Sequence, residues 1–145
     1  VWLLGDGPLK PTLMQLRTDL KVESQVHFAG FQANPFPWLR HADLFVLCSL
    51  NESSPNALLE AVACGCPTIS TDHPGGTREI LEQLGLGHRL TSRLEDWSED
   101  WFKRPGPEVT ARAESKFAAS RVAELYACVL LGNRAVPTTA LKRAG

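Results

Sequence analysis

The 145-residue sequence predicts an α/β fold built on a parallel, doubly wound, Rossmann-like sheet. Short apolar runs of strand length alternate four times with segments of helical character. One run, Asp43 to Cys48, is apolar after its first residue, which is typical of a parallel strand covered on both faces. With 43% hydrophobic and 21% charged residues, the chain has the composition of one globular domain with an ordinary core.

In the first third of the chain, strands are predicted at Val1 to Leu4 and at Val26 to Ala29, followed by the apolar run described above. A short helix is expected from Trp38 to His41. A longer helix is predicted between the first two strands, because leucines recur there at helical spacing: Leu9, Leu13, Leu16 and Leu20. Since Val1 already lies inside a strand of core character, we expect the natural protein to contain a further region upstream.

The next helix is expected to follow Glu52, with Ser54 as its N-cap and Pro55 at its first position. Gly65 suits the left-handed residue that ends such a helix. Further elements are expected in the order strand, helix and weak strand: Thr68 to Ser70, Thr77 to Leu84, and Gly87 to Leu90.

The character of the chain changes after Thr91. A short acidic helix is predicted from Leu94 to Trp101, with Trp97 and Trp101 packed on one face, and a long helix from Ala111 to Leu131. The predicted organisation is a partial nucleotide-sugar-binding core over residues 1–91, helices on or beside it over 92–131, and a disordered tail over 132–145.

Composition excludes several classes of function. A formal net charge of -1 provides no basic face for nucleic acid. The four cysteines stand mostly in apolar runs without metal-ligand spacing, so we expect reduced thiols and no metal site. No apolar run reaches the ~20 residues that span a bilayer. We therefore expect a cytoplasmic protein; attachment of the complete protein to the inner face of a membrane is compatible with this expectation.

Ligands of open parallel sheets bind at the carboxyl ends of the strands, which directs attention to three loops. In the first loop, Gly5 and Gly7 would let a phosphate or ribose approach the backbone, although a plain strand-to-helix turn explains them equally well. In the third loop, Gly75 and Gly76 precede a helix, and Arg78 could meet a phosphate or simply face water. His73 stands beside this loop, and a structural role is favoured for it.

The second loop carries the main candidate site. A helix beginning near Pro55 would direct the backbone N–H groups of its first turn at phosphate or sugar oxygens; these are the amides of Asn56, Ala57 and Leu58. One turn later, Glu60 could reach back to accept hydrogen bonds from a ribose. Glu52, before the helix, could face a sugar hydroxyl or a charge developing at a sugar carbon. A solvated surface role is equally compatible with either glutamate taken singly.

Six segments carry a family resemblance: Gly5 to Leu9, Val26 to Phe31, Ala42 to Leu47, Glu52 to Glu60, Ala63 to Pro67, and Asp72 to Gly76. Their order resembles the carboxyl-terminal, donor-binding domain of the retaining glycosyltransferases of the GT-B fold, family 4, over about residues 1–81. The resemblance implies that the chain is the carboxyl-terminal half of such an enzyme, truncated at its N-terminus.

The resemblance also implies roles for individual residues. Glu52 and Glu60 correspond to the paired glutamates of the E-x7-E motif, with Glu60 on the ribose of the nucleotide and Glu52, the catalytic candidate, near the donor hexose. Phe31 and Gln32 would line the base pocket. Further donor contacts are implied for Ser49, for the backbone of residues 56–58, and for the Gly5 to Gly7 turn.

This sequence departs from the family's pattern in two respects. Ser53 and Ser54 stand where the family usually has glycine and a bulky apolar residue, so we expect a loop that is stiffer or differently shaped. The resemblance also implies that the basic residues which neutralise the diphosphate would come from a strand, loop and helix upstream of Val1, with the acceptor-binding domain expected further upstream still. We therefore expect this chain alone to transfer little or no sugar.

The predicted function is binding of a nucleoside-diphosphate sugar, chiefly a UDP-sugar, for retaining transfer without a required metal or cofactor. The acceptor would be a glycan or a lipid-linked glycan of polysaccharide assembly, bound through the absent N-terminal domain. A nucleotide-sugar epimerase of the same fold is an alternative, which the E-x7-E spacing disfavours. A non-catalytic module that binds a nucleotide or a partner is a second alternative.

Overall fold

The structure, a computed structural model, describes residues 1–96 and 98–117. The chain divides into two compact units, Val1–Trp38 and the residues from Leu39 onward, and each unit is described by itself. Both contain parallel strands connected through helices, which confirms the predicted α/β class. The strands form two separate sheets, of two and three strands, whereas the sequence predicts one sheet.

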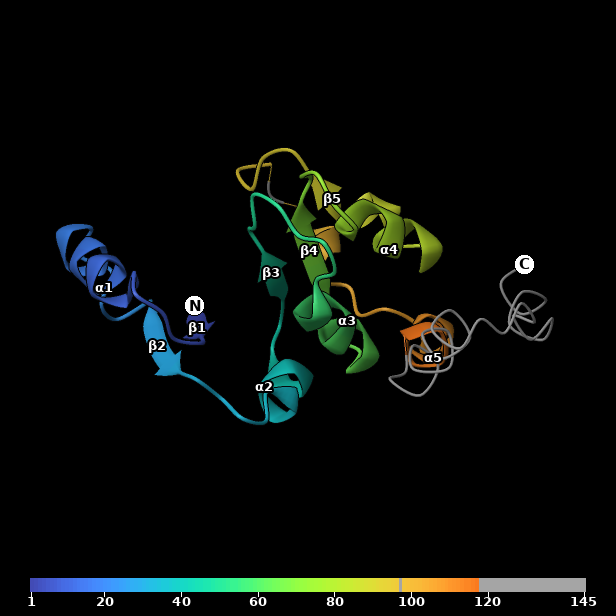
Figure 1. Ribbon diagram of the computed structural model, residues 1–145, viewed down its shortest axis with the longest axis horizontal. Helices are drawn as coiled ribbons and strands as arrows, with labels where there is room; N and C mark the ends of the chain where they lie inside the picture. Colours follow the sequence, from blue (N-terminus) through green and yellow to red (C-terminus); the bar gives the residue numbers. More distant parts are fainter. Residues whose placement is uncertain (97, 118–145) are drawn as a thin grey trace, which may run out of the picture. The chain divides into compact units, whose positions relative to one another are not determined.

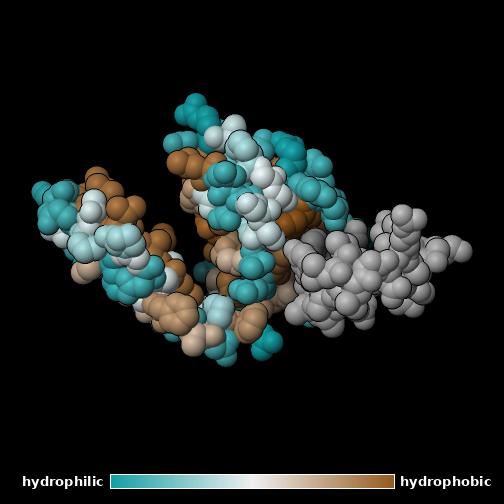
Figure 2. All heavy atoms as spheres, in the orientation of Figure 1, coloured by the Kyte–Doolittle hydropathy of each residue, from teal (hydrophilic) through white to brown (hydrophobic). Residues whose placement is uncertain are grey.

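The first unit contains a two-stranded parallel sheet. Strand β1 (Trp2–Leu4) is followed by helix α1 (Lys10–Asp19) and strand β2 (His27–Gly30). Trp2 pairs with His27 across the sheet, and their rings stack with centroids 4.5 Å apart. Helix α1 buries none of its residues, and Figure 2 shows apolar side chains, coloured brown, at the surface over it. Helix α2 (Phe36–His41) spans the boundary between the units.

The second unit contains a three-stranded parallel sheet, in the order β3-β4-β5 (Figure 1). Strand β3 (Phe45–Leu47) is followed by helix α3 (Asn56–Ala63), strand β4 (Thr68–Thr71) and helix α4 (Thr77–Gln83). A 3₁₀ turn, η1 (Gly87–Arg89), leads into strand β5 (Leu90–Thr91). Because all three strands run parallel, their carboxyl ends lie at one edge, where the loops of the candidate site begin.

Helices α3 and α4 bury their apolar faces in one cluster with helix α5 (Pro107–Phe117). Phe45 and Leu47 of β3 and Leu90 of β5 pack against this cluster. The buried members are Leu58, Val62, Ile80, Leu81, Leu84, Leu86 and Ala113. This core fixes where α3 and α4 begin, and therefore where the two loops that precede them lie.

The predicted start of α3 is wrong by one residue. Pro55 is the N-cap of the helix, because its ψ of 83° lies outside the helical region, and Ser54 makes no side-chain cap. The carbonyl of Pro55 accepts hydrogen bonds from the N–H groups of Leu58 and Leu59. At the other end, Gly65 follows the helix with φ of +68°, which confirms its predicted left-handed conformation.

The predicted acidic helix from Leu94 to Trp101 is also wrong in extent. Among residues 94–96 and 98–102, the structure has only the 3₁₀ turn η2 (Glu99–Phe102), capped by the Ser98 side chain. Ser98 has an extended backbone, and its hydroxyl accepts from the Asp100 N–H, so a new turn begins at this residue and a continuous helix cannot run through it. Trp97 lies outside the described residues.

Helix α5 begins at Pro107, four residues before the predicted start at Ala111, because proline is well suited to the first helical position. The Gly106 carbonyl accepts the first helical hydrogen bonds, from Val109 and Thr110. The predicted continuation beyond residue 117 and the predicted tail over 132–145 lie outside the described residues, and the domain ranges remain predictions. Within residues 1–96 and 98–117, no helix is long and apolar enough to cross a membrane.

Candidate functional site

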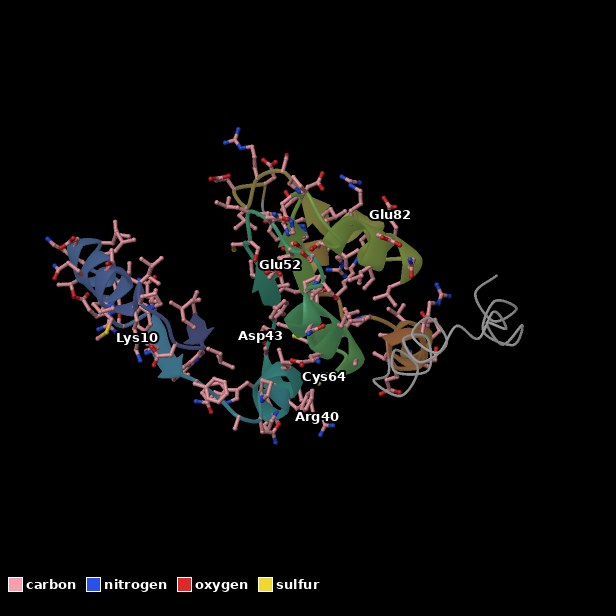
Figure 3. All side chains as sticks on the ribbon, viewed as in Figure 1. Lys10, Arg40, Asp43, Glu52, Cys64 and Glu82 are labelled. Carbon is pink, nitrogen blue, oxygen red and sulfur yellow. The ribbon has the colours of Figure 1, made fainter. Side chains whose placement is uncertain are left out.

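Two loops meet at the carboxyl edge of the three-stranded sheet. Glu52 lies in the loop between β3 and α3 (Figure 3), and Gly75 lies in the loop between β4 and α4. The two residues form an isolated parallel β-bridge, in which the N–H of Gly76 donates to the Glu52 carbonyl over 2.9 Å. The structure therefore joins two of the three predicted loops.

The crossing of these loops requires glycine at both positions. Gly75 has a φ of +122°, and a Cβ atom there would lie 1.9 Å from the Glu52 carbonyl oxygen. A Cβ atom on Gly76 would lie 2.4 Å from the Ser53 carbonyl oxygen. Both distances are far shorter than any van der Waals contact, so the glycines serve first to let the backbones approach each other.

The Glu52 carboxylate is half-buried and held on one side. Its Oε1 atom accepts a hydrogen bond from the Ser49 hydroxyl over 2.7 Å. The Ser49 carbonyl in turn accepts from the hydroxyl of Thr71, the last residue of β4, over 3.1 Å. The structure thus brings together Glu52, Ser49 and the Gly75–Gly76 pair from the predicted set.

The first turn of α3 offers fewer free donors than the sequence predicts. The N–H of Asn56 donates to the Ser54 carbonyl, and the N–H of Leu58 donates to the Pro55 carbonyl, each over 3.0 Å. The expectation of three free amides is therefore wrong for two of them. Ala57 is exposed, and its N–H has no partner among the described residues, so one donor at the positive end of the helix remains available.

Glu60 lies one turn into the same helix and is half-buried. Within the part of the chain that the structure describes, its carboxylate makes no hydrogen bond or ion pair. Leu58, by contrast, is fully buried in the core. A half-buried carboxylate without a protein partner retains all its acceptor capacity for the hydroxyl groups of a ligand.

The other polar side chains beside the Gly75–Gly76 loop are already paired. Arg78 forms ion pairs with Asp72 and Glu82, and the hydrogen bond that its guanidinium donates to the Asp72 carboxylate is the main reason that the pKa of Arg78 is raised. His73 is buried, with Nδ1 3.0 Å from the Pro74 carbonyl and Nε2 3.3 Å from the Thr77 hydroxyl. Since a carbonyl can only accept, Nδ1 carries the proton, and this supports the structural role favoured for His73.

The remaining candidates, Gly5, Gly7, Phe31 and Gln32, belong to the first unit. Gly5, Gly7 and Lys10 border a hollow of about 400 Å³ at the turn between β1 and α1. No atom lies within 4 Å of a Cβ built on either glycine, and Gly5 has a φ of +121°. The side on which a Cβ would stand is therefore open at both glycines, and their contact with a nucleotide stays a prediction.

Phe31 and Gln32 differ in their surroundings. Phe31 is 77% exposed, whereas the Gln32 side-chain amide donates to the Ala29 carbonyl over 2.8 Å. These residues and the Glu52 loops lie in separate units, and the structure describes each group by itself.

Two polar residues that organise the second unit, Thr71 and Arg89, are not among the predicted site residues. Thr71 could have been found from the alignment of strand ends, because the last residue of β4 adjoins the loop that leaves β3. Arg89 is only 6% exposed, and its guanidinium donates to the carbonyls of Trp101 and Lys103 over 2.7 and 2.8 Å. Burial lowers its pKa. Nothing in the local sequence distinguishes Arg89 from an exposed arginine.

Comparison with known sequences gives a consistent result. Residues 1–101 match the family described as glycosyl transferases group 1. An uncharacterized glycosyltransferase of Methanocaldococcus jannaschii is 46% identical over 89 residues, which are 61% of this chain and 22% of that protein. The N-acetylgalactosamine-N,N'-diacetylbacillosaminyl-diphospho-undecaprenol 4-alpha-N-acetylgalactosaminyltransferase of Campylobacter jejuni is 36% identical over 86 residues, covering 58% of this chain and 24% of that protein.

Solved structures agree on the fold. Anabaena HepE in complex with UDP superimposes with a TM-score of 0.71 at 24% identity, covering 90% of this chain and 40% of that one. The same protein has also been solved with UDP and glucose, with a TM-score of 0.69. The fold is therefore that of the GT-B glycosyltransferases, and the chain spans about a quarter or less of the first curated relatives.

Proposed function

The chain belongs to the glycosyl transferases group 1 family, and we propose that it forms the donor-binding part of an enzyme that transfers a hexose from a nucleoside-diphosphate sugar. The observation that carries the proposal is the fixed Glu52 carboxylate at the carboxyl edge of the sheet, beside the Gly75–Gly76 loop. Open α/β sheets bind their ligands at this edge.

In this proposal Glu52 and Glu60 have different partners. Glu60, half-buried and without a protein partner among the described residues, accepts hydrogen bonds from the ribose hydroxyls. The Glu52 carboxylate keeps lone pairs beyond the one that Ser49 occupies, and these meet the donor hexose and the positive charge that develops at its anomeric carbon. The family's E-x7-E spacing supports transfer with retention at that carbon.

The remaining candidate residues contact the other parts of the donor in this proposal. The free amide of Ala57 and the backbone of Gly75 and Gly76 meet the sugar or the diphosphate, with Asn56 and Leu58 supporting that turn. Gly5 and Gly7 border the nucleotide, and Phe31 and Gln32 line the base pocket. The assignment of Gly5 and Gly7 is supported by the free space beside their backbone, where a built Cβ meets nothing within 4 Å.

We propose UDP as the nucleotide, because the superimposable Anabaena protein was solved with UDP and with UDP and glucose. The acceptor is a glycan or a lipid-linked glycan, and the Campylobacter relative's diphospho-undecaprenol acceptor supports the second. We place the complete protein in the cytoplasm, with peripheral attachment at the inner membrane face compatible with a lipid-linked acceptor. Transfer needs no metal or other cofactor in this proposal.

Calorimetric titration of the complete protein with UDP tests the proposal. Glu60→Ala should weaken UDP binding at least tenfold, because hydrogen bonds to a charged group contribute roughly 1.5–3 kcal/mol each. Glu114→Ala, which changes an exposed glutamate of α5, should leave the affinity unchanged. A complete, folded protein that binds no UDP would overturn the proposal.

A further inference from the structure

The Ser49 hydroxyl has one proton, and it donates this proton in a hydrogen bond to Glu52. The Ser49 Oγ atom donates to Oε1 of Glu52 over 2.7 Å, in a partly buried contact three residues apart. A serine hydroxyl has one donor, and the oxygens of a diphosphate are acceptors only. While the contact with Glu52 persists, Ser49 cannot also donate to the diphosphate.

The backbone that carries Ser49 is itself held by the neighbouring strand. In the parallel register of β3 and β4, Leu47 lies opposite Ser70, so Thr71 falls beside the residues that leave β3. The Thr71 hydroxyl lies 3.1 Å from the Ser49 carbonyl and 3.4 Å from the Leu47 carbonyl. At the end of the β3-β4 pairing, the Thr71 side chain therefore makes the hydrogen bond that a backbone N–H makes between the preceding residues.

Glu52 is fixed from the opposite side through its backbone. Its carbonyl accepts from the Gly76 N–H over 2.9 Å, and Gly75 passes so close that no Cβ fits between them. The side chain is held by Ser49 and the main chain by the glycine loop. A carboxylate anchored at both ends has little rotational freedom left to lose when a sugar binds.

We propose that Ser49 and Thr71 are positioning residues that orient the Glu52 carboxylate toward the donor sugar. This inference rests on the proposed function, in which Glu52 meets the donor hexose. Ser49 then affects the sugar only through Glu52, in contrast to the direct contact with diphosphate or sugar that the family resemblance implies. Thr71 acts one step further back, through the Ser49 main chain.

A double-mutant cycle separates positioning from direct contact. Affinities for UDP, and for whichever of UDP-glucose, UDP-galactose and UDP-N-acetylglucosamine binds most tightly, are measured on the complete protein carrying Ser49→Ala, Glu52→Ala or both. Ser49→Ala should weaken UDP-sugar binding five- to tenfold and change UDP binding less than twofold. In the Glu52→Ala background, Ser49→Ala should have no further effect.

Conservative variants provide the matched controls. Ser49→Thr keeps the hydroxyl and should retain UDP-sugar affinity within about twofold. Thr71→Val keeps the shape but loses the hydroxyl, and should weaken UDP-sugar binding about two- to fivefold, whereas Thr71→Ser should not. Thermal unfolding of each variant confirms that it is folded; if Ser49→Ala does not fold, the Thr71 pair carries the test.

Two results would overturn the inference: a Ser49→Ala variant that loses UDP and UDP-sugar affinity equally, or an effect that persists when Glu52 is already alanine. A ligand-free measurement distinguishes this failure from failure of the proposed function. The ¹³C resonance of the Glu52 carboxyl should shift in Ser49→Ala and stay in place in Ser49→Thr, even if no nucleotide binds. An unshifted resonance in Ser49→Ala would overturn the positioning role independently.

Discussion

Gly75 combines two constraints that act on a single residue. Its φ of +122° is a conformation that residues with a side chain rarely adopt, and the space that a Cβ would need is occupied by the Glu52 carbonyl oxygen. Gly7, in the predicted nucleotide loop, has neither constraint, because its φ is unexceptional and no atom lies within 4 Å of its built Cβ. Two glycines that look alike in sequence therefore have different requirements.

We expect Gly75→Ala to lower the free energy of unfolding by at least about 2 kcal/mol, from backbone strain together with displacement of the Glu52 loop. Gly7→Ala should stay within about 0.5 kcal/mol of the natural protein. Urea denaturation of the complete protein measures both. Equal stability of the two variants would show that the loops do not cross as described.

The candidate site could be predicted from sequence in part. The positions of Glu52 and Glu60, one before a helix and one a turn into it, follow from the strand-to-helix pattern and place both near one loop. Two hydrogen bonds could not be predicted in this way: the Asn56 N–H donates to the Ser54 carbonyl, and the Thr71 hydroxyl donates to the Ser49 carbonyl. Both depend on backbone angles and strand register that residue types do not specify. Those contacts therefore emerge only from the structure.

At the scale of elements, the strands and helices of the described chain follow the predicted order, because apolar periodicity reports which face is buried. The errors occur at the ends of helices. The extended backbone and side-chain cap of Ser98 begin the short η2 turn inside the predicted acidic helix, and the ψ of Pro55 puts the start of α3 one residue later than predicted. Such boundaries are decided by geometry within a few residues, which a hydrophobic pattern does not report.

Arg89, the last residue of η1, donates to carbonyls at the end of the η2 turn, and no carboxylate of the described residues forms an ion pair with it. Arg89→Met should destabilise the protein by roughly 1–3 kcal/mol, because the carbonyls of Trp101 and Lys103 lose their buried donor. Amide hydrogen exchange over residues 98–103 should accelerate most. Arg93→Met, which removes an exposed ion pair with Glu95, provides the control and should change stability by less than about 1 kcal/mol.

Thiol reactivity tests the position of Cys66 at the entry to β4. Its side chain is fully buried, and burial raises the pKa of its thiol, so the reactive thiolate becomes available only at higher pH and on opening of the fold. Iodoacetamide at pH 8, followed by peptide mass mapping, should modify the exposed Cys48 well before Cys66. Adding urea should remove the difference; equal rates in the native protein would contradict the fold at β4.

At the scale of the whole molecule, the sequence predicts one sheet and the structure has two. The β1-β2 pair and the β3-β4-β5 sheet each satisfy the parallel pattern, but no pairing of described residues joins them. Predicted donor residues accordingly fall into two units, with Gly5 in one and Glu52 in the other. Periodicity identifies strands and their parallel character, whereas the neighbours of each strand depend on contacts between distant segments.

The chain by itself should transfer no measurable sugar. Departure of a nucleoside diphosphate requires cations that stabilise the charge on its phosphates. Two cations follow the described site loops, in the first turns of α1 and α4, and both are already paired with carboxylates. Lys10 pairs with Asp6, whose pKa is lowered mainly by that hydrogen bond, and Arg78 pairs with Asp72. The chain also spans only about a quarter or less of its first curated relatives.

A coupled assay for UDP release, with a lipid-linked glycan as the acceptor and UDP-glucose, UDP-galactose and UDP-N-acetylglucosamine as donors, compares the 145-residue chain with the complete protein. We expect UDP release only from the complete protein. Its Glu52→Ala variant should release UDP at least about a hundredfold more slowly, since electrostatic groups at a reacting centre contribute about this much to the rate. Turnover by the 145-residue chain alone would mean that Lys10 or Arg78 leaves its carboxylate partner to hold the diphosphate. Asp72→Asn would then raise that turnover, because it releases Arg78 from its main ion pair.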